Sequence, residues 1–588
     1  MMSGTRTLMI IVMLIVAIAP TMAYAAYDAP SSTHYEVTLE VDPERHAIKG
    51  TSTIIYCNRE LIALDSLYLT LYPNAFDEEG EAPLIAPASV SYPEGFDPGY
   101  ITVDVIDRTY EVVDDTFLRI DLTDPLTPGE SVNIELNFDI KVPHLTHRFG
   151  YHDGIIYAGN CLPLVCPYKE GGWVRHPYTA RGDPFYSESA QWSVSITAPT
   201  GWTVASTGTP IDEDVGESTF TTTYVAPDTR DFAFSCSERY EVATLQHGAT
   251  TIRSYYLPGH EEGGVRACEL ARQAMYVYED IFGPYPYDTF SIAETHLGAA
   301  GMEYPHLIFV DQQYYTSPHD MIFEVIIAHE VAHQWWYGVV GNDQVCHSFI
   351  DESLAQLSTL AYFEEHGDLI GTSYYENYLR DPYDRARKEG ISDIIDRSLE
   401  EYGSDYEYMV MAYWKGPLVL DMLRWTVGSD EFYDALSDIY NKHTFGIIDV
   451  ATFENEFMTR IPEKELDTFF DVLLRSDSLP DIIAYEATYD DGTAIIEPTN
   501  KVMVLPVEAC VTLEDGSTMT VTGMPPLEMN VQSAPVSYVL DPRDRIVESN
   551  EENNTGSFST DEKRLPLPYA PIGLVAAIVI ALLWRKRS

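Results

Sequence analysis

Basic residues are scarce in this chain of 588 residues. It has 35 lysines and arginines against 92 aspartates and glutamates, which gives a formal net charge of −57. A surface of this sign repels phosphate backbones and therefore argues against nucleic acid as a partner. Such an acidic surface usually keeps a protein soluble, and only secondarily steers cationic substrates toward it.

Cysteines are also few, and their spacing is uninformative. The chain has seven, with no CxxC pair and no spacing typical of a thiolate zinc site, so neither a disulfide framework nor a zinc finger is indicated. Cys161 and Cys166 could form a disulfide in an oxidising compartment. The alternative is that all seven are small core residues.

The remaining composition is that of a globular protein, with 45% hydrophobic and 12% aromatic residues, and the length allows two to four folded units. Strand and helix patterns predict a multidomain α+β protein. We expect an N-terminal antiparallel β domain over 26–248, a mainly helical domain over 249–482, a small β-sandwich over 483–548 and a polar linker over 549–564.

Both ends of the chain carry apolar segments. Arg6, an apolar run and the small-x-small sequence Ala23-Tyr24-Ala25 predict a signal peptide over 1–25, with an uncleaved anchor as the alternative. Residues 565–584 contain no charge and are long enough to cross a bilayer as one helix, followed by a basic tail over 585–588. We therefore expect export and a single-pass cell-membrane anchor, with the folded domains outside. The tail also resembles surface-protein sorting signals that are removed.

A possible metal site begins with His329 and His333. Histidines four residues apart lie one turn above each other on one helix face, so both imidazoles can reach one ion, and Glu330 can contact a metal-bound water. Glu352, nineteen residues after His333, lies on the next predicted helix and completes a His, His, Glu set. Such a set leaves the fourth zinc position open, which favours a zinc hydrolase with one Zn²⁺ per chain over two packed core histidines.

The motifs around these residues resemble those of a known family. HEVAHQWWYGVVG (329–341) with DESLA (351–355) closely resembles the metal motif of the aminopeptidase N and leukotriene hydrolase family of gluzincin zinc metallopeptidases. GMEYP (301–305) resembles the exopeptidase motif of that family, and YWKG (413–416) resembles its tyrosine motif. The resemblance implies a thermolysin-like catalytic domain over 249–482.

The resemblance also implies roles for the matched residues. His329, His333 and Glu352 would bind Zn²⁺, and Glu330 would be the general base. Tyr413 would donate a hydrogen bond to the developing oxyanion. The substrate-binding residues would be Glu303, which would hold the free α-ammonium of a peptide, Gly301, Met302 at the border of the first side-chain pocket, and Asn160 of the β domain.

Two departures from the family pattern bear on function. Tyr304 replaces the usual asparagine of the exopeptidase motif, and the large C-terminal helical domain of the longer relatives has no counterpart, so we expect a more open cleft. The implied function is removal of N-terminal residues from peptides with a free N-terminus. The alternatives are a zinc endopeptidase of the same fold, a non-catalytic surface binding protein and, with less support, an epoxide hydrolase. Oligomeric state is not predicted.

Overall fold

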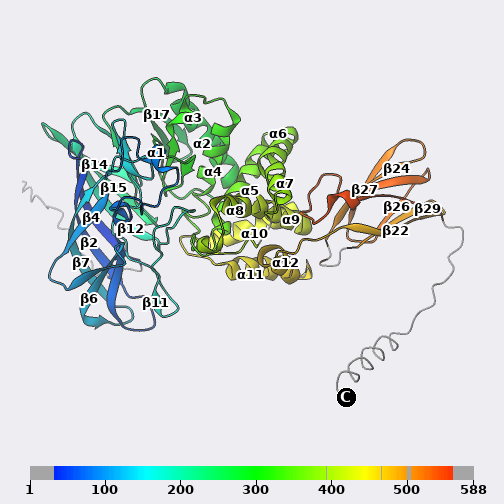
Figure 1. Cartoon of the computed structure of the whole chain (residues 1–588), viewed down its shortest axis with the longest axis horizontal. Coiled ribbons are helices and arrows are strands. Elements are labelled where there is room, and N and C mark those ends of the chain that lie inside the picture. Colours follow the sequence, from blue (N-terminus) through cyan, green and yellow to red (C-terminus); the bar gives the residue numbers. More distant parts are fainter. Residues whose placement is uncertain (1–31, 392–393, 465, 500–502, 504, 561–588) are drawn as a thin grey trace, which may run out of the picture.

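The computed structural model describes residues 32–391, 394–464, 466–499, 503 and 505–560. In Figure 1 the chain runs from a β domain through a helical domain to a small β domain at the opposite end. The protein is thus a multidomain α+β protein. The predicted signal peptide (1–25), membrane helix (565–584) and tail (585–588) lie outside the described residues. Within those residues, no helix is both long and apolar enough to span a bilayer.

The N-terminal β domain is built on a seven-stranded sheet. Its strands alternate between buried and exposed side chains, as β1 does over His34–Asp42, because one face covers the core and the other meets solvent. All its pairs are antiparallel except β1 with β12. The strand order is β14 (Thr209–Val215), β15 (Thr219–Thr229), β12 (Ala190–Pro199), β1, β2 (Ala47–Cys57), β7 (Ser131–Lys141) and β4 (Tyr100–Val105).

Smaller sheets complete this domain and connect it to the next. A buried aromatic cluster, which includes Tyr157 of the β domain and Tyr304 of the helical domain, joins the two. The smaller sheets are β3 (Leu64–Thr70), β6 (Phe117–Leu126) and β5 (Tyr110–Val113); β13 (Thr203–Ser206), β16 (Phe234–Ser237), β9 (Ile155–Ala158) and β8 (Phe149–His152); and the hairpin β10 (Tyr168–Lys169) with β11 (Gly172–Trp173). Short helices are η1 (Tyr72–Phe76) and α1 (Ala88–Ser91).

The helical domain begins with a five-stranded sheet. Its order is β17 (Glu241–His247), β18 (Thr250–Tyr256), β19 (Thr289–Thr295), β21 (Leu307–Asp311) and β20 (Gly301–Met302). Because β17 and β18 form one hairpin, the predicted boundary between residues 248 and 249 cuts through a single unit. The domain therefore starts near residue 241 instead, a position that strand patterning alone could not distinguish from the preceding β domain.

The helices of this domain pack around α4 (Met321–Ala332) and α5 (Phe349–Glu365). Most residues of both helices are buried, and these include polar residues such as Glu330 on α4 and Asp351 and Glu352 on α5. The other helices are α2 (Glu261–Ile281), α3 (Gln312–Tyr315), α6 (Asp368–Tyr374), η2 (Tyr375–Arg380), α7 (Asp381–Lys388), η3 (Leu399–Glu401), α8 (Asp405–Met409), η4 (Val410–Lys415), α9 (Gly416–Val427), α10 (Ser429–Lys442), α11 (Val450–Arg460), η5 (Pro462–Lys464) and α12 (Asp467–Arg475).

The C-terminal β domain pairs two four-stranded sheets. One has the order β26 (Leu527–Asn530), β23 (Thr493–Thr499), β22 (Ile483–Asp490) and β29 (Ser559–Thr560). The other has the order β25 (Thr518–Gly523), β24 (Val507–Leu513), β27 (Pro535–Leu540) and β28 (Thr555–Ser557).

The predicted linker over 549–564 differs from the structure in its first part. Residues 551–553 form the 3₁₀ turn η6 (Glu551–Asn553), and β28 and β29 then add an edge strand to each sheet of the C-terminal domain. The polar composition of this stretch hid the strands, since edge strands face solvent and carry few apolar residues.

The second of the two alternatives, that all seven cysteines are small core residues, holds for the five that are buried. All seven are free thiols in the structure, and Cys161 and Cys166 are buried in the β domain without a bridge between them. Only Cys346 and Cys510 are half-exposed.

Candidate active site

The three predicted metal ligands converge at the junction of α4 and α5. His329 lies in the last turn of α4, His333 immediately follows that helix, and Glu352 lies in the first turn of α5. The two imidazole Nε2 atoms are 3.1 Å apart. Glu352 Oε2 is 3.3 Å from Nε2 of His329 and 3.6 Å from Nε2 of His333. All three side chains are buried.

These separations fit a zinc ion. A tetrahedral zinc with bonds of about 2.0–2.1 Å holds its ligand atoms about 3.3 Å apart, close to the observed distances. His333 Nδ1 lies 3.1 Å from the carbonyl oxygen of Trp336, which can only accept, so His333 donates there and its Nε2 is free to bind metal. Glu352 Oε2 is buried and accepts no hydrogen bond within the described residues. The site is therefore suited to one Zn²⁺.

Glu330 faces the same cleft and is closely approached by the backbone of β20. A β-carbon built on Gly301 would lie 2.2 Å from Glu330 Oε1, so only glycine fits this position. Burial, together with the negative charge of Glu303, raises the pKa of the Glu330 carboxyl well above its usual range. A carboxylate with a raised pKa is a better proton acceptor than an ordinary carboxylate, as a general base requires.

Glu303 lies one strand repeat beyond Gly301 and also points into the cleft. Its side chain is 4% exposed, and its Oε1 accepts a hydrogen bond of 3.2 Å from Gln344 Nε2. Among the described residues, no lysine, arginine or histidine forms an ion pair with it. Burial and the nearby charge of Asp183 raise the pKa of Glu303 to about 8. A buried carboxylate of this kind would be stabilised by a cationic ligand.

Tyr413 reaches the metal ligands from a π-helical segment. It lies on η4, between α8 and α9, where the wider turn changes the direction of the side chains. Its ring lies 5.9 Å from the His329 ring, with an angle of 30° between the planes. Desolvation and the charge of Glu352 raise the pKa of the Tyr413 hydroxyl above its ordinary value. The hydroxyl therefore stays protonated and can donate a hydrogen bond.

These groups surround a cleft of about 480 Å³. No residue beyond Trp414 lines it within the described part of the chain, so the C-terminal β domain does not cover it. A larger cavity, of about 700 Å³, lies between the helical and C-terminal domains. That cavity contains none of the predicted site residues, and its Arg424 already pairs with Asp421 at 2.5 Å.

Two of the predicted substrate contacts are wrong. Met302 is 1% exposed and packs in the aromatic cluster behind β20, because neighbouring residues of a strand point to opposite faces and Gly301 and Glu303 take the cleft face. Asn160 is buried between the two domains. Its Nδ2 donates to Asp231 at 2.7 Å, and its Oδ1 accepts from the Tyr304 hydroxyl at 2.6 Å.

The Asn160 contact explains the unusual Tyr304. The tyrosine at this position sends its hydroxyl across the domain boundary, and a β-carbon on Gly159 would lie 1.9 Å from that hydroxyl. Glycine at 159 and asparagine at 160 thus accommodate the tyrosine ring and satisfy its hydroxyl. The pair holds the domains together instead of contacting substrate.

Sequence reasoning missed two polar residues of the site, Asp183 in the cleft and Gln344 behind Glu303. Asp183, on the loop between β11 and β12, lines the cleft and pairs with Arg148 at 2.5 Å. Gln344, after α4, contacts Glu303 and donates to Asp351 at 2.6 Å. Asp183 is one of 92 acidic residues and has no helical spacing to the metal motif, so nothing in the sequence singled it out.

Known proteins resemble this chain in sequence and in fold. Residues 266–472 match the model of the peptidase family M1 domain. The matched stretch contains Glu303, the His329 to His333 motif, Glu352 and Tyr413, the residues whose motifs resemble the aminopeptidase N-like gluzincin family. Aminopeptidase 2 of Candida albicans is 21% identical over 442 residues, 70% of this chain and 44% of that protein. Alanine/arginine aminopeptidase of Saccharomyces cerevisiae is 26% identical over 212 residues, 33% of this chain and 24% of that protein. The chain thus spans less than half the length of these relatives.

Solved structures have the same fold. The M1 zinc metallopeptidase from Deinococcus radiodurans superposes with a TM-score of 0.55 at 20% identity, over 76% of this chain and 95% of that one. Aminopeptidase A from Legionella pneumophila, in complex with aspartic acid, superposes with a TM-score of 0.62 at 15% identity, over 88% of this chain and 59% of that one. The predicted β and catalytic domains thus have counterparts of known structure.

Proposed function

We propose that this protein is a zinc-dependent aminopeptidase that removes N-terminal residues from peptides. The observation that carries the proposal is the position of Glu303, a buried carboxylate beside the candidate zinc site with no cationic partner among the described residues. A peptide α-ammonium supplies the missing charge and would bring the first peptide bond over the metal. The peptidase family M1 match over residues 266–472 supports the same activity.

The residues of the cleft would then divide the chemistry between them. His329, His333 and Glu352 would hold Zn²⁺, and the bound ion would supply a Lewis acid for the scissile carbonyl and would lower the pKa of a bound water to about 7. Glu330 accepts the proton of the attacking water at its carboxylate and delivers it to the leaving amine. The Tyr413 hydroxyl donates a hydrogen bond to the carbonyl oxygen as negative charge develops there.

Peptide substrates are supported by a structural relative. A structure of the Deinococcus radiodurans M1 zinc metallopeptidase, with a TM-score of 0.53 to this chain, holds a Tyr-Ser-Ala substrate. The cleft of about 480 Å³ in this chain is large enough for a few residues of extended peptide.

The proposal is tested by comparing aminoacyl fluorogenic substrates with their N-acetylated forms, with and without a chelator. We expect hydrolysis of the free-amine substrates only, lost on chelation and restored by Zn²⁺. Equal hydrolysis of blocked substrates would instead indicate the endopeptidase. No hydrolysis by zinc-loaded protein would indicate the binding protein.

We also propose that the enzyme is exported and anchored to the cell membrane. This rests on the sequence of residues 1–25 and 565–584 alone. Full-length protein should sediment with membranes and be degraded by protease added to intact cells, whereas a chain ending at residue 560 should be released into the medium. Protection from added protease would contradict the proposal.

A further inference from the structure

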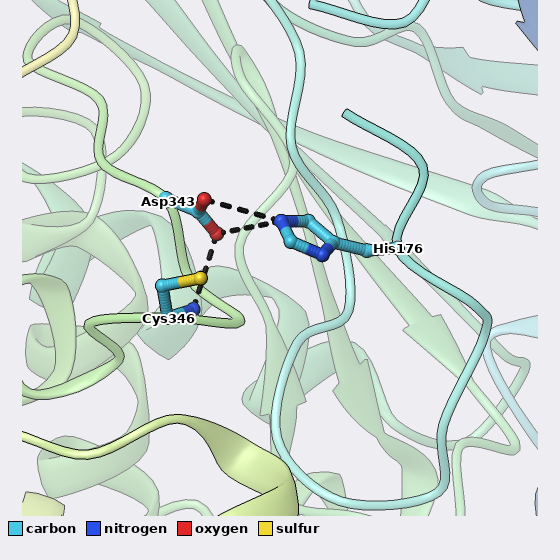
Figure 2. A group of neighbouring side chains, drawn as sticks. All are labelled: His176, Asp343 and Cys346. Carbon is cyan, nitrogen blue, oxygen red and sulfur yellow. Dashed lines mark hydrogen bonds and ion pairs between the residues drawn. The ribbon is translucent and has the colours of Figure 1, made fainter. Parts of the chain in front are cut away.

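A second group of possible metal ligands lies outside the cleft. His176 belongs to the loop between β11 and β12 of the β domain, while Asp343 and Cys346 belong to the loop between α4 and α5. In Figure 2 the His176 ring points at the Asp343 carboxylate, with the Cys346 side chain beside it. His176 Nε2 is 3.0 Å from Asp343 Oδ1 and 3.1 Å from Oδ2. The ligand atoms of all three residues lie within 4.8 Å of one another.

The donor set suits zinc. Imidazole nitrogen, carboxylate oxygen and thiolate sulfur are all common zinc ligands, and three of them leave one position for water or a further ligand. The nitrogen and oxygen atoms are already about as far apart as zinc requires, and the sulfur has to approach by about 1 Å at most. The side chains of His176 and Asp343 are 16% and 10% exposed, so the group is largely desolvated but reachable from solvent.

A simple ion pair accounts for only part of this arrangement. It explains why His176 faces Asp343, and the backbone N–H of Cys346 donates to Asp343 Oδ1 at 3.1 Å to fix the loop. The Cys346 thiol interacts with the same carboxylate, which brings a third potential metal ligand to the pair. Zinc binding would release the proton of the Cys346 thiol and make the sulfur a thiolate ligand.

We propose that His176, Asp343 and Cys346 bind a second zinc ion, which joins the β domain to the catalytic domain. Gln344, next to Asp343, donates hydrogen bonds to Glu303 at 3.2 Å and to Asp351 at 2.6 Å. An ion that fixes this loop therefore also fixes the side chain that orients Glu303. The site goes beyond the proposed catalytic zinc, with which it shares no ligand.

The sulfur ligand gives the second site a signal of its own. His329, His333 and Glu352 contain no sulfur, so replacing zinc by Co²⁺ should produce a thiolate-to-metal charge-transfer band only at the second site. We expect this band, and about two metal ions per chain, in the wild type. Cys346→Ser and His176→Gln should lose the band and one ion while retaining the other. Cys510→Ser is the matched control, because Cys510 is also a half-exposed free thiol, and it should keep both.

The charge-transfer band and the metal content test the second zinc site independently of enzyme activity. A wild type without the band, or a band that persists in Cys346→Ser, would overturn it. If Cys346→Ser unfolds, which circular dichroism would reveal, His176→Gln provides the same test. The coupling to Glu303 predicts that correctly folded Cys346→Ser has a severalfold higher KM for aminoacyl substrates with kcat little changed. An unchanged KM would contradict that coupling.

Discussion

Gly301 and Glu330 lie so close that a β-carbon on the glycine would be 2.2 Å from the carboxylate oxygen Oε1. We therefore predict that Gly301→Ala displaces the Glu330 carboxylate. A displacement of about 1 Å from the reacting atoms costs roughly 100-fold in rate, so kcat/KM should fall by about that factor. Steady-state kinetics on an aminoacyl substrate measures the effect.

The control for this substitution is Gly172→Ala. Nothing lies within 4 Å of a β-carbon at Gly172, and its backbone is outside the left-handed region. Gly172→Ala should leave activity unchanged, and both variants should bind the same amount of zinc. Wild-type activity in Gly301→Ala would show that the close contact has no part in positioning Glu330.

Glu303→Gln tests the recognition of a free N-terminus. The amide keeps the shape and one hydrogen-bond acceptor but removes the charge that an α-ammonium would pair with. Because hydrogen bonds to charged groups contribute about 1.5–3 kcal/mol, kcat/KM for aminoacyl substrates should fall roughly 10- to 150-fold. Metal content, measured by mass spectrometry, should not change. If kcat/KM of Glu303→Gln equals that of the wild type, another residue recognises the N-terminus.

Tyr413→Phe tests the oxyanion contact. Loss of one preorganised donor costs about 100-fold or more in kcat, and KM should change much less, because the hydrogen bond strengthens only as charge develops. Tyr276→Phe is the control, since Tyr276 is 68% exposed on α2. If Tyr413→Phe has the kcat of the wild type, the Tyr413 hydroxyl does not stabilise the transition state.

His147 should make the protein less stable in mild acid. Burial, and then the charge of Arg148, lowers the pKa of His147 to about 3 in the folded state, against 6.5 for an ordinary histidine. The unfolded state thus binds the additional proton as pH falls below 6.5, and stability is lost between pH 6.5 and about 3. At pH 5 the loss from this group is about 2 kcal/mol.

Urea unfolding at pH 7.5 and pH 5 checks this expectation. His147→Gln cannot titrate, so the difference in unfolding free energy between the two pH values should be smaller than in the wild type by about 2 kcal/mol. An equal difference in both proteins would mean that His147 is not responsible.

The convergence of the three candidate metal ligands could be predicted from helix geometry and from the order of the two helices. A helix places His329 and His333 on one face whatever surrounds it, and the connection over residues 333–348 returns the chain so that Glu352, in the first turn of α5, reaches the same point. The cleft partners contributed by the β domain could not be predicted. Asp183 lies on an irregular loop that has no sequence pattern. Asn160 was predicted to contact substrate, but its side chain forms hydrogen bonds with Asp231 and Tyr304.

Met302 could have been placed correctly from the sequence. A glycine and a glutamate on the cleft side of an extended segment leave the residue between them facing the core. The strands β28 and β29 were beyond sequence reasoning, because their three and two residues are stabilised by pairing with β27 and β22 and not by a pattern of their own.

Anomalous diffraction at the zinc absorption edge, on crystals of the zinc-loaded protein lacking residues 1–25 and 561–588, would locate the metal and its ligands. The account predicts a strong peak about 2.0–2.1 Å from Nε2 of His329 and of His333, with Glu352 as the third protein ligand. A zinc-loaded crystal with no peak among these three side chains would contradict it.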